Sequence, residues 1–80
     1  MKYIVIETPI GEIGFTFNNF INHSDFSECM IHLLAMQCKL NFTKLKTVSG
    51  GFVDSRGNCF GESESLKLKS RDTDSFIISK

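Results

Sequence analysis

Residues 2–17 read Lys-Tyr-Ile-Val-Ile-Glu-Thr-Pro-Ile-Gly-Glu-Ile-Gly-Phe-Thr-Phe, and this stretch decides the fold class. Residues 2–7 are rich in β-branched and aromatic side chains, which predicts a strand. Residues 8–11 carry turn chemistry, because proline presets φ and glycine accepts a positive φ. Residues 13–17 alternate large apolar with small or polar side chains, which is the period of a half-buried strand. The stretch therefore predicts a β-hairpin.

A helix follows this hairpin, with predicted bounds of Asp25 and about Lys39. Residues 22–24 offer capping side chains, and acidic residues in the first turns complement the helix dipole. The polar arc of this helix is narrow, whereas packing on one sheet face needs an apolar stripe of only about 100°. The helix thus has apolar surface to spare. Either the domain wraps it on two sides, or a second copy covers it, and we expect a homodimer or higher oligomer.

The second half of the chain predicts further strands. Residues 45–53 predict a third strand, in which Gly50 and Gly51 indicate a bulge or a close backbone approach. Residues 54–58 predict a hairpin loop with glycine in the left-handed conformation. Residues 59–66 predict a fourth strand, and residues 75–78 an optional fifth. The expected fold is α+β: an antiparallel sheet of four to five strands, in ββαββ order, with one helix packed on one face.

The composition indicates one small globular domain spanning residues 1–80, with 41% hydrophobic residues and a formal net charge of zero. A neutral chain lacks the basic footprint of a general nucleic-acid-binding protein. No stretch approaches the roughly 20 apolar residues of a membrane span, and the first residues lack a signal-peptide profile. The three cysteines form no CxxC motif. We therefore expect reduced, buried thiols in a cytoplasmic protein.

Metal binding has one weak candidate. Cys29 and His32 are three residues apart on the expected helix, so they share roughly one face. Together with His23 or Cys59 they could bind zinc, but zinc sites usually contain close ligand pairs, and none occurs here. A core thiol beside a solvated imidazole explains the pair better. We expect no metal and no cofactor.

Catalysis also has only weak candidates. His23 and Ser24 are adjacent, as a base and a nucleophile would be, but Ser24 is better explained as a helix cap. Glu62 and Glu64 could act as an acid/base pair, although a solvated strand edge is the commoner reason for such a pattern. No G-x-S-x-G motif is present. We expect no catalytic residue and no enzyme activity.

The strongest candidate for a binding site is the cluster of glycine, serine and arginine in residues 49–71. This segment holds four of the six glycines, five serines and both arginines. Successive backbone N–H groups at glycines can form an anion-binding nest, and a guanidinium can grip phosphate bidentately. The predicted ligand-binding residues are Ser49, Gly50, Gly51, Arg56, Ser63, Ser65, Ser70 and Arg71. The alternative is a twisted hairpin with a polar tail, in which Arg71 only pairs with Asp74 to pin a turn.

Three segments carry a resemblance: Gly51-Phe52-Val53, then residues 59–66 (Cys-Phe-Gly-Glu-Ser-Glu-Ser-Leu), then Ser70-Arg71 with Asp74. They resemble a group of small uncharacterised phage and prophage proteins whose C-terminal halves read GFV, C-[FY]-G-x-S-x-SL and SR-x-x-D. The resemblance implies an accessory protein that acts in the cytoplasm of a bacterial host cell. Such proteins often disable host defence, by sequestering its nucleotide signal or by blocking a defence protein.

From the cluster and the resemblance together, we expect a non-catalytic protein that binds and sequesters a small phosphate-bearing nucleotide. The alternative is an inhibitor that docks on a bacterial defence complex, as anti-CRISPR proteins do.

Overall fold

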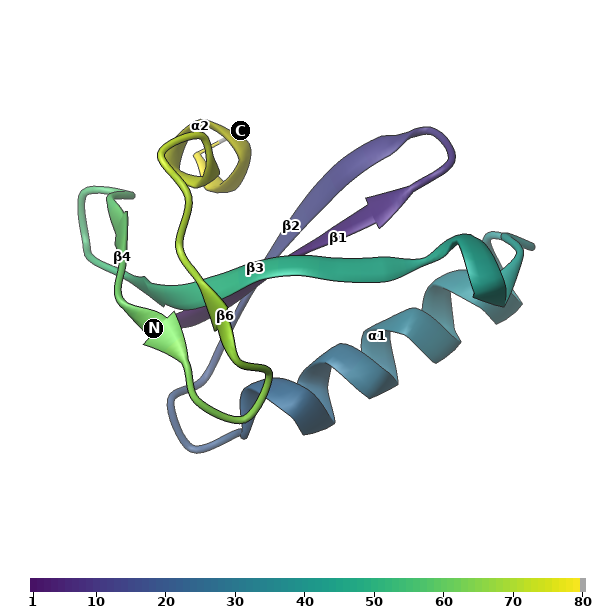
Figure 1. Cartoon of the computed structure of the whole chain (residues 1–80), viewed down its shortest axis with the longest axis horizontal. Helices are drawn as coiled ribbons and strands as arrows, with labels where there is room; N and C mark the ends of the chain where they lie inside the picture. Colours follow the sequence, from purple (N-terminus) through teal and green to yellow (C-terminus); the bar gives the residue numbers. More distant parts are fainter. Residues whose placement is uncertain (80) are drawn as a thin grey trace.

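The structure is a computed structural model, and it describes residues 1–79. Strands β1 (Lys2–Thr8) and β2 (Gly11–Phe17) form the expected hairpin. Helix α1 (His23–Gln37) leads through a short 3-10 helix, η1 (Phe42–Lys44), into strand β3 (Lys46–Val53). With strand β4 (Cys59–Phe60), these strands make one four-stranded antiparallel sheet in the order β2-β1-β3-β4. The predicted α+β class with one main helix is confirmed (Figure 1).

Strand β1 lies between two strands of the sheet, and side chains bury both of its faces. Ile4 and Ile6 point to the face covered by α1, where they pack with Phe17, Leu34 and Leu45. Tyr3 and Val5 point to the opposite face, where they pack with Val53. A second short helix, α2 (Asp74–Ile78), covers that second face (Figure 1). Successive side chains of β1 point to opposite faces, so they contribute to two hydrophobic clusters, one on each side of the sheet.

The predicted fourth strand ends much earlier than residue 66. Gly61 has φ +76° and turns the chain out of the main sheet after Phe60. Strand β5 (Glu62–Ser63) then pairs with β6 (Leu68–Lys69) in a separate two-stranded ladder. The turn passes close over β3, since a Cβ added at Gly51 would lie 2.5 Å from the Phe60 carbonyl oxygen. The close backbone approach predicted for the glycine pair is confirmed, whereas the bulge lies at Val48, opposite Val5 and Ile6.

The predicted last strand is wrong, because residues 74–78 form helix α2. On a strand, Ile77 and Ile78 would point to opposite faces, but on a helix they are only about 100° apart. Both therefore pack on the same face of the sheet, while Phe76 is 75% exposed. Gly14 of β2 leaves room for this helix, since a Cβ there would lie 2.6 Å from Cδ1 of Ile78.

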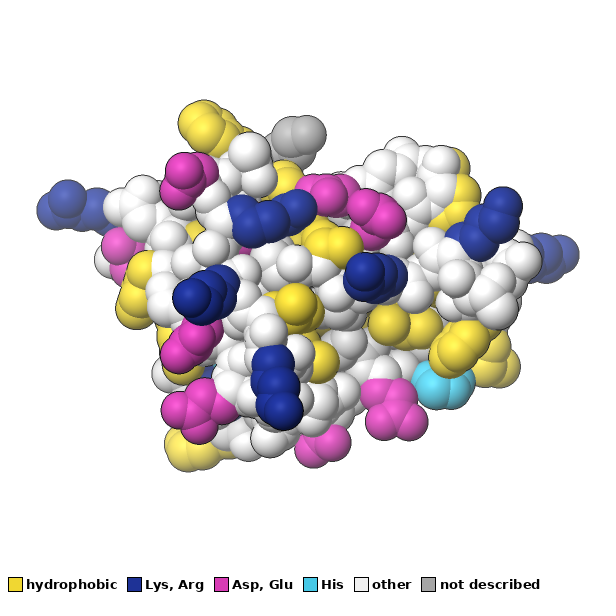
Figure 2. Space-filling model, in the orientation of Figure 1, with side chains coloured by type: hydrophobic (Ala, Val, Ile, Leu, Met, Phe, Trp, Pro, Cys, Tyr) yellow, Lys and Arg dark blue, Asp and Glu magenta, His cyan; other side chains and the backbone are white. Residues whose placement is uncertain are grey.

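A further correction concerns the exposure of the three thiols. Cys29 and Cys38 are exposed and Cys59 is half-buried, so the expected burial of the thiols is wrong. All three are free, as expected. Leu33 and Met36 are also exposed, the latter by 77%. Figure 2 shows hydrophobic side chains at the surface over the C-terminal end of α1. None of the helices within residues 1–79 is long and apolar enough to cross a membrane.

Candidate functional site

Arg71 is held by two carboxylates. Its Nη2 and Nη1 donate to the two oxygens of Glu12 at 2.8 and 3.2 Å, and its Nε donates to Oδ1 of Asp74 at 3.0 Å. These contacts raise the pKa of Arg71 and lower that of Glu12, chiefly through the hydrogen bonds between the two side chains. The guanidinium therefore joins β2 to the start of α2. This geometry matches the alternative given above, in which Arg71 pairs with Asp74 and holds a turn in place.

Asp74 is the centre of this network and is completely buried. Its Oδ2 accepts from the Tyr3 hydroxyl at 2.5 Å and from the Arg71 backbone N–H at 2.9 Å. Burial by itself would raise the pKa of Asp74, but these hydrogen bonds outweigh it and hold the pKa below its ordinary value. Burial, and then the hydrogen bond to Asp74, raise the pKa of Tyr3. The network therefore ties α2 to the central strand.

The other predicted residues lie in different places. Arg56 is exposed in the loop between β3 and β4, where Oδ1 of Asp54 accepts its backbone N–H at 2.9 Å. Gly57 in that loop has φ +83°, which confirms its predicted conformation. Ser49 is fully buried in β3, and no described residue forms a hydrogen bond with its Oγ. Neither Arg56 nor Ser49 lines the pocket described below.

The remaining serines hold the turn around β5 and β6. Ser63 is buried, and its Oγ accepts from the Leu66 N–H at 3.2 Å. The backbone N–H of Ser70 donates to the Gly61 carbonyl at 3.0 Å. Ser65 contacts α1, since its Oγ accepts from the Ser24 N–H at 3.1 Å. Of the eight predicted residues, Ser65 alone is among those that line the pocket described next, while Gly50 and Gly51 are buried within β3.

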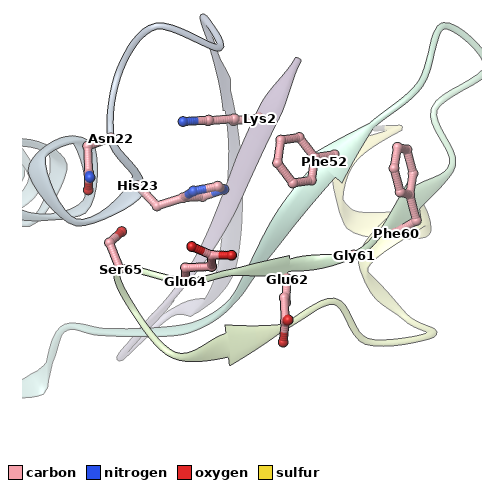
Figure 3. A pocket seen from close by; sticks show the side chains of 9 residues that line it. All are labelled: Lys2, Asn22, His23, Phe52, Phe60, Gly61, Glu62, Glu64 and Ser65. Atoms are coloured by element: carbon pink, nitrogen blue, oxygen red, sulfur yellow. The ribbon is translucent and has the colours of Figure 1, made fainter.

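A pocket of about 490 Å³ lies where the N-terminus of α1 meets β1, β3 and the turn after β4. Figure 3 shows that the residues lining it come from these separate elements. Its lining consists of Lys2, Asn22, His23, Phe52, Phe60, Gly61, Glu62, Glu64 and Ser65. The volume falls within the range of small-molecule sites, which is about 300–1,000 Å³.

Two aromatic rings form one wall of this pocket. Phe52 of β3 and Phe60 of β4 are directly opposite each other across the strand pair. Their ring centroids are 6.0 Å apart at an interplanar angle of 28°. Phe60 remains 53% exposed, so this wall is partly open to solvent. Such a wall suits a planar ring, because offset stacking is a favoured aromatic geometry.

His23 forms the inner wall and is fixed in place. It is buried at the first position of α1, and its Nε2 lies 2.8 Å from the Gly51 carbonyl oxygen. A carbonyl oxygen only accepts, so Nε2 must carry the proton that it donates. The ring packs edge-on against Phe17 and Phe52. His23 therefore orients the aromatic wall. Ser24 is not the cap that we expected: Asn22 caps α1, and its Oδ1 accepts from both the N–H and the hydroxyl of Ser24.

The charged groups of the pocket are one lysine and two glutamates. Lys2 extends from the start of β1, and its Nζ donates to the Ile21 carbonyl at 2.9 Å. An ammonium has three donor hydrogens, so Lys2 retains two for a ligand. In Figure 3, Glu64 and Lys2 lie on opposite sides of the His23 ring, whereas Glu62 points away from it. No cluster of three or more potential metal ligands occurs among residues 1–79.

Lys2, Phe52 and Phe60 were missed by the sequence reasoning. The two phenylalanines carried a usable signal, because a hairpin loop at residues 54–58 pairs residue 53 with 59 and therefore 52 with 60. Lys2 carried none, since its place beside α1 depends on packing between elements far apart in sequence. Comparisons with models of protein families, with curated proteins and with solved structures found no match. The functional argument therefore rests on the geometry of this pocket.

Proposed function

We propose that the protein is a non-catalytic binding protein that sequesters a small nucleotide-like ligand in the pocket beside His23. The observation that carries the proposal is the pairing of a half-exposed aromatic wall with a lysine in a cavity of about 490 Å³. A base would stack against the aromatic wall of Phe52 and Phe60, which is a sequence-tolerant interaction because every base has a π-face. The phosphate would lie toward Lys2, the single cationic side chain in the lining.

This proposal moves the ligand away from Arg71. The guanidinium already forms ion pairs with Glu12 and Asp74, so a phosphate would have to compete with two carboxylates. The pocket offers stacking area and few cations, and binding would therefore be driven by the base more than by the phosphate.

The biological role follows from the resemblance to phage and prophage accessory proteins. We propose that the protein acts in the cytoplasm of a bacterial host cell and withdraws a nucleotide used by host defence. Sequestration needs no catalysis and no metal. It requires only that the protein be made in excess over its ligand.

The test compares two exposed phenylalanines. Calorimetric titration with nucleoside monophosphates and cyclic nucleotides should detect binding to the wild type. Phe60→Ala should weaken it about 5- to 150-fold, which corresponds to the loss of one base–aromatic stack. Phe76→Ala is the matched control, because Phe76 is 75% exposed on α2 and lies outside the pocket. Absence of binding by every nucleotide would refute the proposal, and recovery of a chemically changed nucleotide would refute its non-catalytic part.

A second surface favours association between proteins. A groove of about 400 Å³ runs along α1 and is lined by Asp25, Glu28, Cys29, His32, Leu33 and Met36. These residues recur at spacings of three and four, so they form one face of the helix. The face is acidic toward the start of α1, while Lys39 and Lys44 follow its end and are exposed. We propose that a second copy of the chain covers this face as an antiparallel homodimer.

Charge complementarity is the reason for choosing a second copy. In an antiparallel pair, the acidic end of each helix lies beside the basic end of the other, and their dipoles also oppose. A stable interface needs about 800 Å² per partner, which extends beyond the groove to side chains such as Phe42. An inhibitor of a bacterial defence complex would use the same exposed face. A strictly monomeric protein in solution would favour that alternative.

A further inference from the structure

The carboxylate of Glu64 lies in the lining of the pocket, where it can contact a bound base. Figure 3 shows Glu64 and Lys2 flanking the His23 ring, with Phe52 beside them. Glu64 is exposed. Its carboxylate forms no direct hydrogen bond or ion pair with any described residue. The carboxylate therefore has both oxygens available for a ligand.

An ionised carboxylate only accepts hydrogen bonds, and its two oxygens accept from two neighbouring donors at once. Among the common bases, guanine presents two adjacent donors, N1–H and the N2 amino group, on its Watson–Crick edge. Adenine and cytosine present one amino group beside a ring nitrogen with a lone pair. Uracil presents one N–H between two carbonyl oxygens. In those three bases, one carboxylate oxygen would face an acceptor and be repelled.

We propose that the pocket selects guanine nucleotides, with Glu64 accepting from N1–H and the N2 amino group while the ring lies against Phe52, the aromatic ring nearer to Glu64 in Figure 3. This inference rests on the proposed function, because it names the ligand class of the same pocket. With its donor edge at Glu64, the nucleotide can direct its phosphate toward Lys2, on the other side of His23. The acidic side of the pocket then distinguishes between bases instead of only repelling the phosphate.

Glu62 provides a matched control, because it is the same residue type on the same turn. It is also exposed and lines the pocket, but its side chain points away from His23 (Figure 3). Glu64→Gln and Glu62→Gln remove the same charge with almost no change in volume. Any general electrostatic effect on a phosphate should therefore be similar in the two variants, whereas recognition of the base edge should differ.

The experiment is calorimetric titration of GMP, AMP, CMP and UMP into the wild type and both variants, with thermal melts to confirm folding. GMP should bind the wild type about 5- to 150-fold more tightly than the other three, the range of one bidentate base contact. Glu64→Gln should remove most of this preference, and Glu62→Gln should retain it.

Three results would overturn the inference, and they separate it from the proposed function. Equal affinity for all four nucleotides would refute guanine selection and leave nucleotide binding intact. A preference for GMP that survives in Glu64→Gln would refute the role of that carboxylate. No binding of any nucleotide would refute both proposals together.

Discussion

Replacing Asp74 by alanine should be the most damaging single change in this small protein. The substitution removes three hydrogen bonds, from the Tyr3 hydroxyl at 2.5 Å, the Arg71 N–H at 2.9 Å and the Arg71 Nε at 3.0 Å. It also leaves the Tyr3 hydroxyl without its partner in a residue that is 0% exposed. Hydrogen bonds to a charged group contribute about 1.5–3 kcal/mol each, so the loss of three of them should cost about 3 kcal/mol or more. An 80-residue domain has a total stability of only about 4–12 kcal/mol.

The assay is thermal unfolding followed by circular dichroism. Each kcal/mol shifts Tm by about 4–8 °C in a domain of 60–100 residues, so Asp74→Ala should lower Tm by about 12 °C or more. Asp72→Ala is the control, because that carboxylate is exposed two positions earlier. A Tm for Asp74→Ala within about 2 °C of the wild type would refute the reasoning, since one kcal/mol already gives a larger shift.

The same carboxylate predicts a dependence of stability on pH. The pKa of Asp74 is lowered from its ordinary value of 3.8 in the folded state. Its contribution is therefore present at neutral pH and is lost as the pH falls below about 4 and through the lowered pKa. Denaturant titrations of the wild type should show this loss, and Asp74→Ala should show less of it. The pKa of Glu12 shifts in the same direction through Arg71, so part of the dependence should persist in the variant.

Three further predictions concern the backbone, the thiols and the outer helix face. Gly51→Ala should lower the free energy of unfolding more than Gly14→Ala, because the new Cβ meets a backbone carbonyl at 2.5 Å in the first case and the flexible end of Ile78 in the second; equal losses in urea denaturation would contradict this. Cys38 should react with a thiol reagent in the native protein faster than Cys59, because Cys38 is exposed whereas burial raises the pKa of the Cys59 thiol; peptide mapping that finds Cys59 labelled first would count against the structure. In sedimentation the wild type should be a dimer at tens of micromolar, and Met36→Lys should shift it toward monomer. Ile10→Lys is the control and should leave the dimer intact, because Ile10 is equally exposed but lies in the β1–β2 turn. A monomeric wild type would refute the proposed homodimer.

Local patterns were sufficient to predict the first hairpin, the main helix and the third strand. In each case the period of the apolar residues matches the element that forms, and turn residues mark its ends. The same method failed for residues 74–78, because an apolar run of this length has no period of its own. What decides that segment is the tie from Asp74 to Tyr3, and two side chains 71 positions apart leave no mark in local sequence.

The site was harder to predict for a related reason. Residue types that bind anions gathered in residues 49–71, but the sequence did not show which of them were already occupied. Arg71 looked available because its partner Glu12 is 59 positions away. Phe52 and Phe60 looked like ordinary strand residues, and only the turn at Gly61 leaves Phe60 exposed beside a pocket. Composition therefore indicated a segment that contributes to the pocket, but not which of its side chains line it.

The contact between Tyr3 and Asp74 also sets an order of events during synthesis. A ribosome that has made β1, β2, α1 and β3 has already exposed the central strand, but one face of that strand still lacks its cover. Tyr3 cannot bury its hydroxyl until a residue 71 positions later has been added. Contacts between residues so far apart in sequence form slowly, because a long loop must close first. The nascent chain must therefore keep one apolar sheet face open to other proteins in the cell until α2 has been synthesised.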